Sequence, residues 1–439
     1  MTLTKIPKII LLSVFMILTN CSSEKDSIDD NNEEDIEENL ITENIYDGWV
    51  ELSTQTEVDN FGANNYTKIT GSLTINRNIT TSNIINLNAL NSLKEVGGNL
   101  HIAYNQITSL KGLDNLEYVG GYLNISYNKV LTNLEGLNKL KIIEDYVLIA
   151  DNDKLTEISS LGNLTKLGGN LNLFRNTILN SLNGLDKIQS INGHLIITEN
   201  GITDLNALIN ITSINGNLIV DDNKNLYNLD GLKNLTTVGG YLDIASSNFS
   251  NLTGLANLKY LGEHLYLSKN DLLTSLDGLT GLDSIHGSLT LSGNKSLTDI
   301  DGLSNTKDIE GSISIKSNEK LTQIDGFTEL KSIGGNILFE YNNSLSNLNG
   351  FNNLETIGGN VILHDINALT NLDGLNKVSA VGTNSYISIF NCENSINFCG
   401  LQSIILNNLI PENKYTVYSN AYNPTYQEIQ NYGSGGCEQ

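Results

Sequence analysis

Apolar side chains recur along most of this chain in a fixed two-part pattern. In segment 287–294, Leu289 and Leu291 alternate with polar residues, which places them on one face of a short strand. The apolar residues that follow recur every three positions, a spacing typical of turns rather than of a continuing strand. The segment begins with glycine and is repeated from Gly311 and Gly335, at intervals of 24 residues. Each unit is therefore predicted to form one coil of chain with its apolar side chains pointing to the axis.

Copies of this segment follow one another along most of the sequence. The clear copies begin at Gly71, Gly98, Gly121, Gly169, Gly193, Gly216, Gly240, Gly287, Gly311, Gly335 and Gly359; weaker ones begin at Asp145 and Glu263, and a degenerate one surrounds Ile387 and Ile389. One coil cannot fold alone, because ordering a residue costs roughly 1–2 kcal/mol and a buried Leu or Ile returns only about 1.5–3 kcal/mol. Stacking of coils supplies the rest. The predicted fold is mainly β, a right-handed parallel β-solenoid over residues 71–390, with caps at 40–70 and 391–439.

Asparagine and paired glycine occupy fixed places in the repeat. Asparagine follows ten of the strands by two residues, at Asn105, Asn128, Asn152, Asn176, Asn200, Asn223, Asn270, Asn294, Asn318 and Asn342. A side-chain amide there is expected to bond the free backbone groups of the turn and to stack with its equivalents. The paired glycines, such as Gly97-Gly98 and Gly239-Gly240, are expected to be turn residues with positive φ. No strand–glycine loop–helix unit surrounds them, so a phosphate-binding loop is not predicted.

The repeat as a whole, L-x-x-L-x-G-L-x-x-L-x-x-I-G-G-x-L-x-I-x-x-N, resembles the leucine-rich-repeat-like receptor L domain, the ligand-binding solenoid of insulin and epidermal growth factor receptors. Among bacterial proteins it looks like the surface lipoproteins of Bacteroidetes that carry long arrays of this unit. The resemblance covers roughly residues 71 to 390. It implies a solenoid that binds a partner, but no ligand-contact motif of the receptors has a match here.

The ends of the array are predicted to be capped. Segment 53–62 is expected to form a short helix, with Thr54 and Glu57 as a capping box and Gly62 as its stop. Segments 398–401 and 421–437 resemble the terminal cap of such lipoproteins. That resemblance pairs Cys399 with Cys437 in a disulfide and leaves Cys392 as a free thiol, while a bond between Cys392 and Cys399 is the rival pairing.

The N-terminus resembles that of a bacterial lipoprotein. Lys5 and Lys8 precede an apolar run over residues 9–18, which has the length of a signal-peptide core and is too short to span a bilayer. The run ends in Leu18-Thr-Asn-Cys21, which resembles a lipobox, although Asn20 stands where Gly or Ala is usual. This predicts a signal peptide at 1–20 and lipidation of Cys21; the alternative is an ordinary signal peptide with a chance cysteine.

Residues 21–39 are acidic and almost devoid of apolar side chains, which predicts a disordered tether. An acidic stretch after the lipidated cysteine resembles the surface-export signal of Bacteroidetes lipoproteins, and a plain solvated linker is the alternative. We therefore expect a protein anchored by lipid in the outer membrane and facing the exterior. The net charge of -24 argues against nucleic-acid binding and against membrane contact other than through the anchor. A monomer without a cofactor is expected.

The search for catalytic chemistry gives one cluster. The five histidines, at 101, 194, 264, 286 and 364, are spread over many coils without zinc-ligand spacing, and no catalytic triad can be assembled. Glu199, Asp221, Asp222 and Asp243 fall on the outward side of three consecutive coils. Three interpretations apply to them: a Ca²⁺ site, a carboxylate pair of a β-helix polysaccharide enzyme, or a solvated face of an acidic protein.

The outward strand positions carry a second candidate site. Several are aromatic or aliphatic: Tyr104, Tyr127, Leu148, Phe174, Ile196, Ile219, Tyr266, Leu338, Tyr341, Ile362 and Phe390. Contiguous apolar residues on a solvent face mark interaction sites, although β-propensity alone also favours Tyr and Ile in strands. The sequence thus predicts a non-catalytic binding or adhesion module that presents its strand face, with Tyr104, Tyr127, Phe174, Tyr266, Tyr341 and Phe390 as contact residues, to a protein or glycan partner.

Overall fold

The computed structural model describes residues 43–77 and 82–431. The predicted signal peptide, the lipidation site Cys21, the acidic tether and Cys437 lie outside the described residues, so these remain predictions. Across the described ranges, no helix combines the length and the apolar character that crossing a membrane requires.

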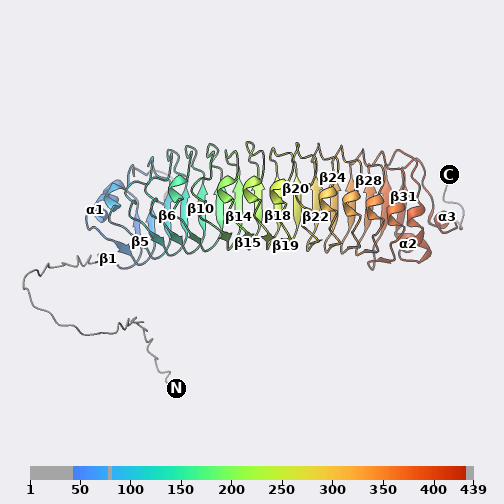
Figure 1. Cartoon of the computed structure of the whole chain (residues 1–439), viewed down its shortest axis with the longest axis horizontal. Coiled ribbons are helices and arrows are strands. Elements are labelled where there is room, and N and C mark those ends of the chain that lie inside the picture. The colour runs from blue at the N-terminus through green and yellow to red at the C-terminus, as the bar shows by residue number, and fades with distance from the viewer. Residues whose placement is uncertain (1–42, 78–81, 432–439) are drawn as a thin grey trace, which may run out of the picture. The chain divides into compact units, whose positions relative to one another are not determined.

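The described chain is built around one long parallel sheet. Its 16 strands follow in chain order and each pairs with the next. Figure 1 shows the strands side by side along the array, between the helices at its two ends. The strands are β2 (Val50–Leu52), β4 (Leu73–Ile75), β6 (Leu100–Ala103), β8 (Leu123–Ser126), β10 (Val147–Ala150), β12 (Leu171–Phe174), β14 (Leu195–Thr198), β16 (Leu218–Asp221), β18 (Leu242–Ala245), β20 (Leu265–Ser268), β22 (Leu289–Ser292), β24 (Ile313–Lys316), β26 (Ile337–Glu340), β28 (Val361–His364), β30 (Ile387–Phe390) and β31 (Tyr415–Tyr418).

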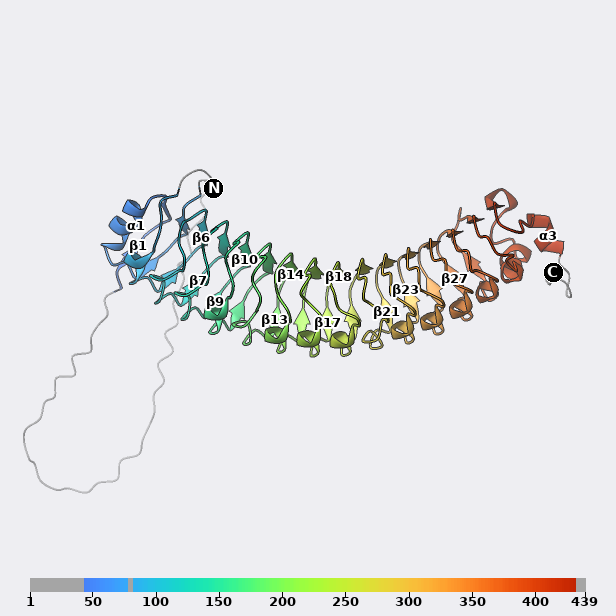
Figure 2. The ribbon, with the colours of Figure 1, turned by 90° about the horizontal axis from the view of Figure 1, so that it is seen from above.

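Shorter strands and turns complete each coil. The two-residue strands form three further parallel sheets: β1 (Ile45–Tyr46), β3 (Lys68–Ile69), β5 (Glu95–Val96), β7 (Tyr118–Val119), β9 (Ile142–Ile143) and β11 (Lys166–Leu167); β13 (Ser190–Ile191), β15 (Ser213–Ile214), β17 (Thr237–Val238) and β19 (Tyr260–Leu261); and β21 (Ser284–Ile285), β23 (Asp308–Ile309), β25 (Ser332–Ile333), β27 (Thr356–Ile357) and β29 (Ala380–Val381). Single turns of 3₁₀ helix follow in many coils: η1 (Asn88–Leu90), η2 (Ser159–Leu161), η3 (Asn206–Leu208), η4 (Asp230–Leu232), η5 (Thr253–Leu255), η6 (Asp301–Leu303), η7 (Asp325–Phe327), η8 (Asn349–Phe351), η9 (Asp373–Leu375) and η10 (Cys399–Leu401), with η11 (Glu412–Lys414) near the C-terminus. In Figure 2 the array curves, with the long sheet on its concave side and these turns on its convex side.

The core runs along the axis of the array, as the apolar pattern predicts. In β22, the side chains of Leu289 and Leu291 are fully buried. The apolar residues at three-residue steps are buried too, as at Leu297, Ile300 and Leu303. Strand residues and turn residues therefore face one another across each coil, and the predicted β-solenoid is confirmed.

The strand pairing aligns equivalent residues of successive coils into columns. Leu289 pairs with Ile313, 24 residues on, whereas Leu195 pairs with Leu218, 23 residues on. Outward side chains therefore form three columns on the concave side: one from the second residue of each strand, one from the fourth, and one from the residue that follows the strand. We call these the second-position, fourth-position and post-strand columns.

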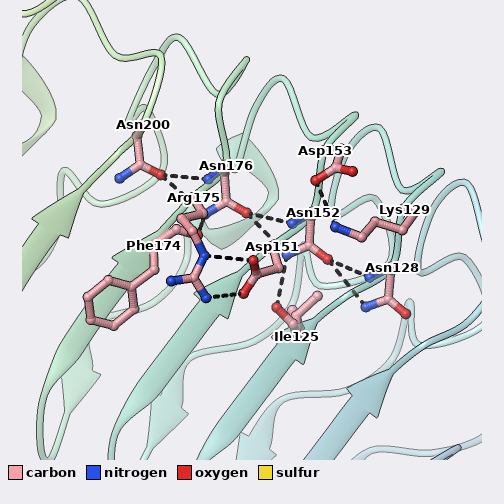
Figure 3. Close-up of polar contacts among 10 residues, drawn as sticks. All are labelled: Ile125, Asn128, Lys129, Asp151, Asn152, Asp153, Phe174, Arg175, Asn176 and Asn200. Carbon is pink, nitrogen blue, oxygen red and sulfur yellow. Dashed lines mark hydrogen bonds and ion pairs between the residues drawn. The ribbon is translucent and has the colours of Figure 1, made fainter. Parts of the chain in front are cut away.

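The recurring asparagines form the predicted ladder. The Oδ1 atom of Asn176 accepts a hydrogen bond from the backbone N–H of Asn152 at 3.2 Å. The Nδ2 atom of Asn176 donates to the carbonyl oxygen of Ile149 at 2.9 Å. It also donates to the Oδ1 atom of Asn200 at 3.2 Å (Figure 3). Each amide thus satisfies backbone groups that the turn leaves free. Ser247 stands in place of one ladder asparagine and keeps part of the pattern.

The prediction that the paired glycines have positive φ is wrong. The only glycines with positive φ in the described chain are elsewhere, as at Gly112 and Gly136. The paired glycines are needed because the coils approach too closely for a side chain: a Cβ atom on Gly97 would lie 2.4 Å from the carbonyl oxygen of Thr70. Positive φ occurs instead in the post-strand column, at 58° for Tyr104 and 48° for Arg175.

The N-terminal cap is helix α1 (Gln55–Gly62). Its N-terminus carries the predicted capping box, since the side chain of Thr54 accepts from the N–H of Glu57 and the Glu57 carboxylate accepts from the N–H of Thr54. Gly62 does not act as the expected left-handed stop, because the capping residue Ala63 is right-handed at φ -57°. A Cβ atom on Gly62 would lie 2.2 Å from the carbonyl oxygen of Ala89, so close packing against η1 requires glycine there.

At the other end, β31 pairs with β30 and extends the long sheet beyond Phe390. Helices α2 (Gln402–Leu406) and α3 (Tyr426–Asn431) close the array. Cys392 is buried and Cys399 is partly exposed, and their sulfur atoms are not bonded to one another. The rival pairing is therefore absent from the structure, while the pairing of Cys399 with Cys437 remains a prediction.

Candidate functional site on the concave sheet

A hollow of about 440 Å³ lies on the concave sheet between β6 and β12. It brings together Tyr104, Tyr127 and Phe174, three of the six residues predicted to contact a partner. A larger hollow, of about 600 Å³, lies among the short strands and turns near Lys166 and Lys187, and polar and charged side chains dominate its lining. The concave hollow combines apolar and aromatic side chains, as binding sites usually do.

Small residues occupy the fourth-position column where the hollow lies, and two of them, Ser126 and Ala150, line it. Ala103, Ser126 and Ala150 stand in register on β6, β8 and β10. The next residue of the column, on β12, is Phe174. The floor is therefore low over three strands and ends against an aromatic wall. Leu148, in the second-position column, adds a further apolar side chain to the lining.

One rim of the hollow is a pair of stacked tyrosines in the post-strand column. The rings of Tyr104 and Tyr127 lie 4.8 Å apart between centroids and are inclined by only 6°. The ammonium group of Lys129 lies 5.8 Å from the centroid of the Tyr127 ring. Stacking therefore covers one face of each ring.

The same rim continues into a two-bond ion pair. The guanidinium of Arg175 donates from Nε and Nη2 to the two carboxylate oxygens of Asp151, each at 2.8 Å (Figure 3). The Arg175 guanidinium is the main reason why the pKa of Asp151 is lowered, and a hydrogen bond from Tyr127 adds to the effect. Lys129 pairs likewise with Asp153 at 2.9 Å. The carboxylates of Asp151 and Asp153 are thus each held in an ion pair.

His101 lines the opposite side of the hollow, in the second-position column. Burial lowers the pKa of its imidazole, and the positive charge of Arg77 lowers it further. The ring is therefore neutral at pH 7 and presents a hydrogen-bonding group without a charge.

The other three predicted contact residues lie outside the hollow. Tyr266 packs edge-on against Tyr241, with centroids 5.9 Å apart. Phe390 stacks between His364 and Tyr418 in the fourth-position column, at 4.7 Å and 5.0 Å. Tyr341, in the post-strand column, is 52% exposed. The predicted contact residues thus do not form one continuous patch.

His364 belongs to a polar network near the C-terminal end of the long sheet. Its Nε2 atom contacts a carboxylate oxygen of Glu340, and its Nδ1 atom lies 2.7 Å from the carboxylate of Asp365. Burial alone would raise the pKa of Glu340, but hydrogen bonds from Lys316 and His364 outweigh it and lower that pKa. Two other histidines serve the backbone: Nδ1 of His194 accepts from the N–H of Asn217 at 2.9 Å, and Nδ1 of His264 accepts from the N–H of Ser288 at 2.8 Å.

The four acidic residues singled out in the sequence are divided among the three columns. Glu199 and Asp222 follow strands β14 and β16, Asp221 is the fourth residue of β16, and Asp243 is the second residue of β18. Asp222 pairs with Lys224 at 2.6 Å. Burial, and then the charge of Asp221, raises the pKa of Asp243. Over the residues described, no three His, Cys, Asp or Glu side chains converge in a group that could hold a metal ion.

Comparisons with known proteins agree with this architecture. Residues 50–155 and 210–275 match the sequence model of the Receptor L domain. Over these residues the solenoid is similar to the receptor L domain. No curated protein sequence matches it. A solved structure titled "Crystal structure of TLR13-ssRNA13 complex" is 15% identical over 79% of this chain and 88% of that chain, with a TM-score of 0.13, which is too low to carry an argument.

A receptor L-domain-like solenoid suggests a binding module, since folds of this type are typically non-catalytic. Within this solenoid, sequence reasoning missed the residues that shape the hollow: the small floor residue Ala150 and the ion pair of Asp151 and Arg175. One signal was available, because the sequence has only two arginines among 439 residues: Arg175 lines the hollow, and the charge of Arg77 acts on His101, which also lines it.

Proposed function

We propose that this protein is a non-catalytic binding module, held at the cell surface by lipid on Cys21, that engages its partner through the concave hollow. The observation that carries the proposal is the hollow itself, where Tyr104, Tyr127 and Phe174 surround a floor of small residues. Tyrosine, arginine and other large side chains around a small pocket are the features of interface hot spots.

The competing function is a polysaccharide enzyme that uses the four acidic residues. Glycoside hydrolysis needs two carboxyl groups held on either side of one bond. Here Asp222 is engaged by Lys224, and the remaining carboxylates belong to different columns and different strands. This arrangement favours binding over catalysis.

The proposed location at the cell surface is supported by two sequence features: the lipobox-like segment that ends at Cys21 and the acidic tether over 21–39. The expected result of Cys21→Ser is loss of the protein from the outer-membrane fraction. Retention of the variant in that fraction would contradict the anchor.

Binding through the hollow is tested by filling it. Ala150→Phe places a ring on Phe174, and the fold already accommodates such stacking at Phe390 and Tyr418. Ser292→Phe is the matched control, because Ser292 has the same strand position outside the hollow. The full chain would be probed against arrays of surface glycans and proteins.

We expect Ala150→Phe to weaken binding of the partner at least tenfold and Ser292→Phe to leave it unchanged. Equal binding by both variants would contradict the assignment of the site. Turnover of a polysaccharide that is lost when Asp221 and Asp243 become asparagine would favour the enzyme.

A further inference from the structure

The hollow and the acidic residues lie side by side on the concave sheet. The wall of the hollow is Phe174 on β12, and the next strands in the sheet are β14, β16 and β18 (Figure 2). Neighbouring strands lie about 4.8 Å apart, so Asp221 on β16 and Asp243 on β18 are about 10 and 14 Å from β12. One ligand segment of ordinary length therefore reaches both the hollow and these carboxylates.

These carboxylates are not held in ion pairs, unlike Asp151 at the hollow, although the charge of Arg175 is felt at one of them, Glu199. Asp151 is held by Arg175. Glu199, Asp221 and Asp243, by contrast, form no ion pair with any residue in the described part of the chain. We call these three residues the acidic tract. Burial and the charge of Asp221 already raise the pKa of Asp243, so a cation placed here would relieve an existing repulsion.

The chemistry of the hollow favours a protein side chain over a sugar. Sugar rings stack on open aromatic faces, whereas Tyr104 and Tyr127 stack on one another at 4.8 Å, so one face of each ring is already covered. The floor of Ala150 and Leu148 and the wall of Phe174 are apolar. Such a recess suits an aliphatic or aromatic side chain that inserts as an anchor.

The negative charge of the chain favours a ligand with basic residues next to its apolar anchor. The net charge of the chain is -24, which attracts basic partners at long range and steers their encounter. The acidic tract supplies the matching local charge beside the hollow.

We propose that the hollow and the acidic tract together bind a basic segment of a partner protein, with an apolar anchor in the hollow and Lys or Arg side chains on the tract. An extended segment rises about 3.3 Å per residue, so the basic residues stand about three or four positions from the anchor. This inference rests on the proposed function and adds to it the class of partner.

The test is selection of a phage-displayed library of random peptides on the full chain, followed by calorimetric titration of the most enriched peptide as a synthetic probe. Enriched sequences should carry a Phe, Leu, Tyr or Trp with Lys or Arg three or four positions away. Ala150→Phe should weaken the probe at least tenfold while Ser292→Phe does not. Affinity should fall as salt is raised, because the tract is screened.

A charge-matched pair of variants isolates the tract. Asp221→Asn with Asp243→Asn should weaken the probe about tenfold. Asp277→Asn with Asp373→Asn, which removes the same charge from exposed turns, should weaken it less than twofold.

Three results would overturn the inference: no enrichment of peptides, enrichment of acidic or uncharged peptides, or equal binding by both charge variants. A glycan that binds the full chain and is lost with Ala150→Phe would overturn the class of partner while leaving the hollow as the binding site. Peptides insensitive to Ala150→Phe would instead count against the hollow, and so against the proposed function.

Discussion

Replacing one ladder asparagine tests how much the side-chain hydrogen bonds between neighbouring coils stabilise the array. In Asn176→Ala, the buried N–H of Asn152 loses its acceptor at 3.2 Å and the carbonyl of Ile149 loses a donor at 2.9 Å. Each buried polar group left unpaired costs about 1–3 kcal/mol, and water entering the vacated space recovers part of this. We expect the free energy of unfolding to fall by about 3 kcal/mol. Asn183→Ala, at an exposed position of the same coil, should change it by less than about 0.5 kcal/mol.

The assay combines urea denaturation with amide hydrogen exchange. Because each coil contacts only its neighbours, the loss of protection should concentrate in β10, β12 and β14 and leave β24 and β26 unchanged. Asn176→Ser should fall between the two alanine variants, since Ser247 fills the equivalent place with a hydroxyl that donates to Ala245 at 3.0 Å. Equal stability of the Asn176→Ala and Asn183→Ala variants would refute the idea that the ladder stabilises the array.

Three further predictions concern a glycine, a carboxylate and a cysteine pair. Gly302→Ala places a Cβ atom 1.9 Å from a carbonyl oxygen of the preceding coil and should cost about 1–3 kcal/mol or more in urea denaturation, whereas Gly162→Ala, whose nearest contact is 3.2 Å, should be neutral. Burial and a neighbouring carboxylate raise the pKa of Asp243, so the ionised side chain destabilises the fold and the free energy of unfolding falls as pH rises through the raised pKa. Asp243→Asn should therefore raise the urea midpoint at pH 7. This gain should disappear below the ordinary pKa of about 3.9. Non-reducing peptide mapping should give a peptide joining Cys399 to Cys437, and a bond from Cys399 to any other cysteine would show that prediction to be wrong.

The fold was predictable because the residues that form the strand, the turn and the ladder occur in one coil and recur in the others. The alternation at Leu289 and Leu291 sets the strand, the three-residue steps set the turn, and the asparagine two residues beyond the strand sets the ladder. The paired glycines were misjudged for a physical reason. Positive φ and close approach both select glycine, and only the neighbouring coil, which places the Thr70 carbonyl 2.4 Å from the Cβ position of Gly97, separates the two causes.

The candidate site was only partly predictable, because it is a property of several coils in register. Phe174 was recognised as an outward aromatic residue, but the hollow beside it is also lined by the small residues Ser126 and Ala150 on neighbouring strands. These align only once the pairing is known, since the spacing is 23 residues from β6 to β8 and 24 residues from β8 to β10. The positive φ of the post-strand column could not be predicted from the sequence for another reason. Tyrosine, aspartate and arginine all adopt it there, so no single residue type indicates it.

Photo-crosslinking from inside the hollow on intact cells tests the central claim most directly. The full chain would carry a benzophenone amino acid in place of Phe174, and in a second variant in place of Tyr260, an exposed residue of β19 outside the long sheet. The account predicts one protein adduct from position 174, none from position 260, and loss of the adduct when Ala150→Phe fills the hollow. An adduct that forms equally from both positions, or that persists in the filled hollow, would contradict it.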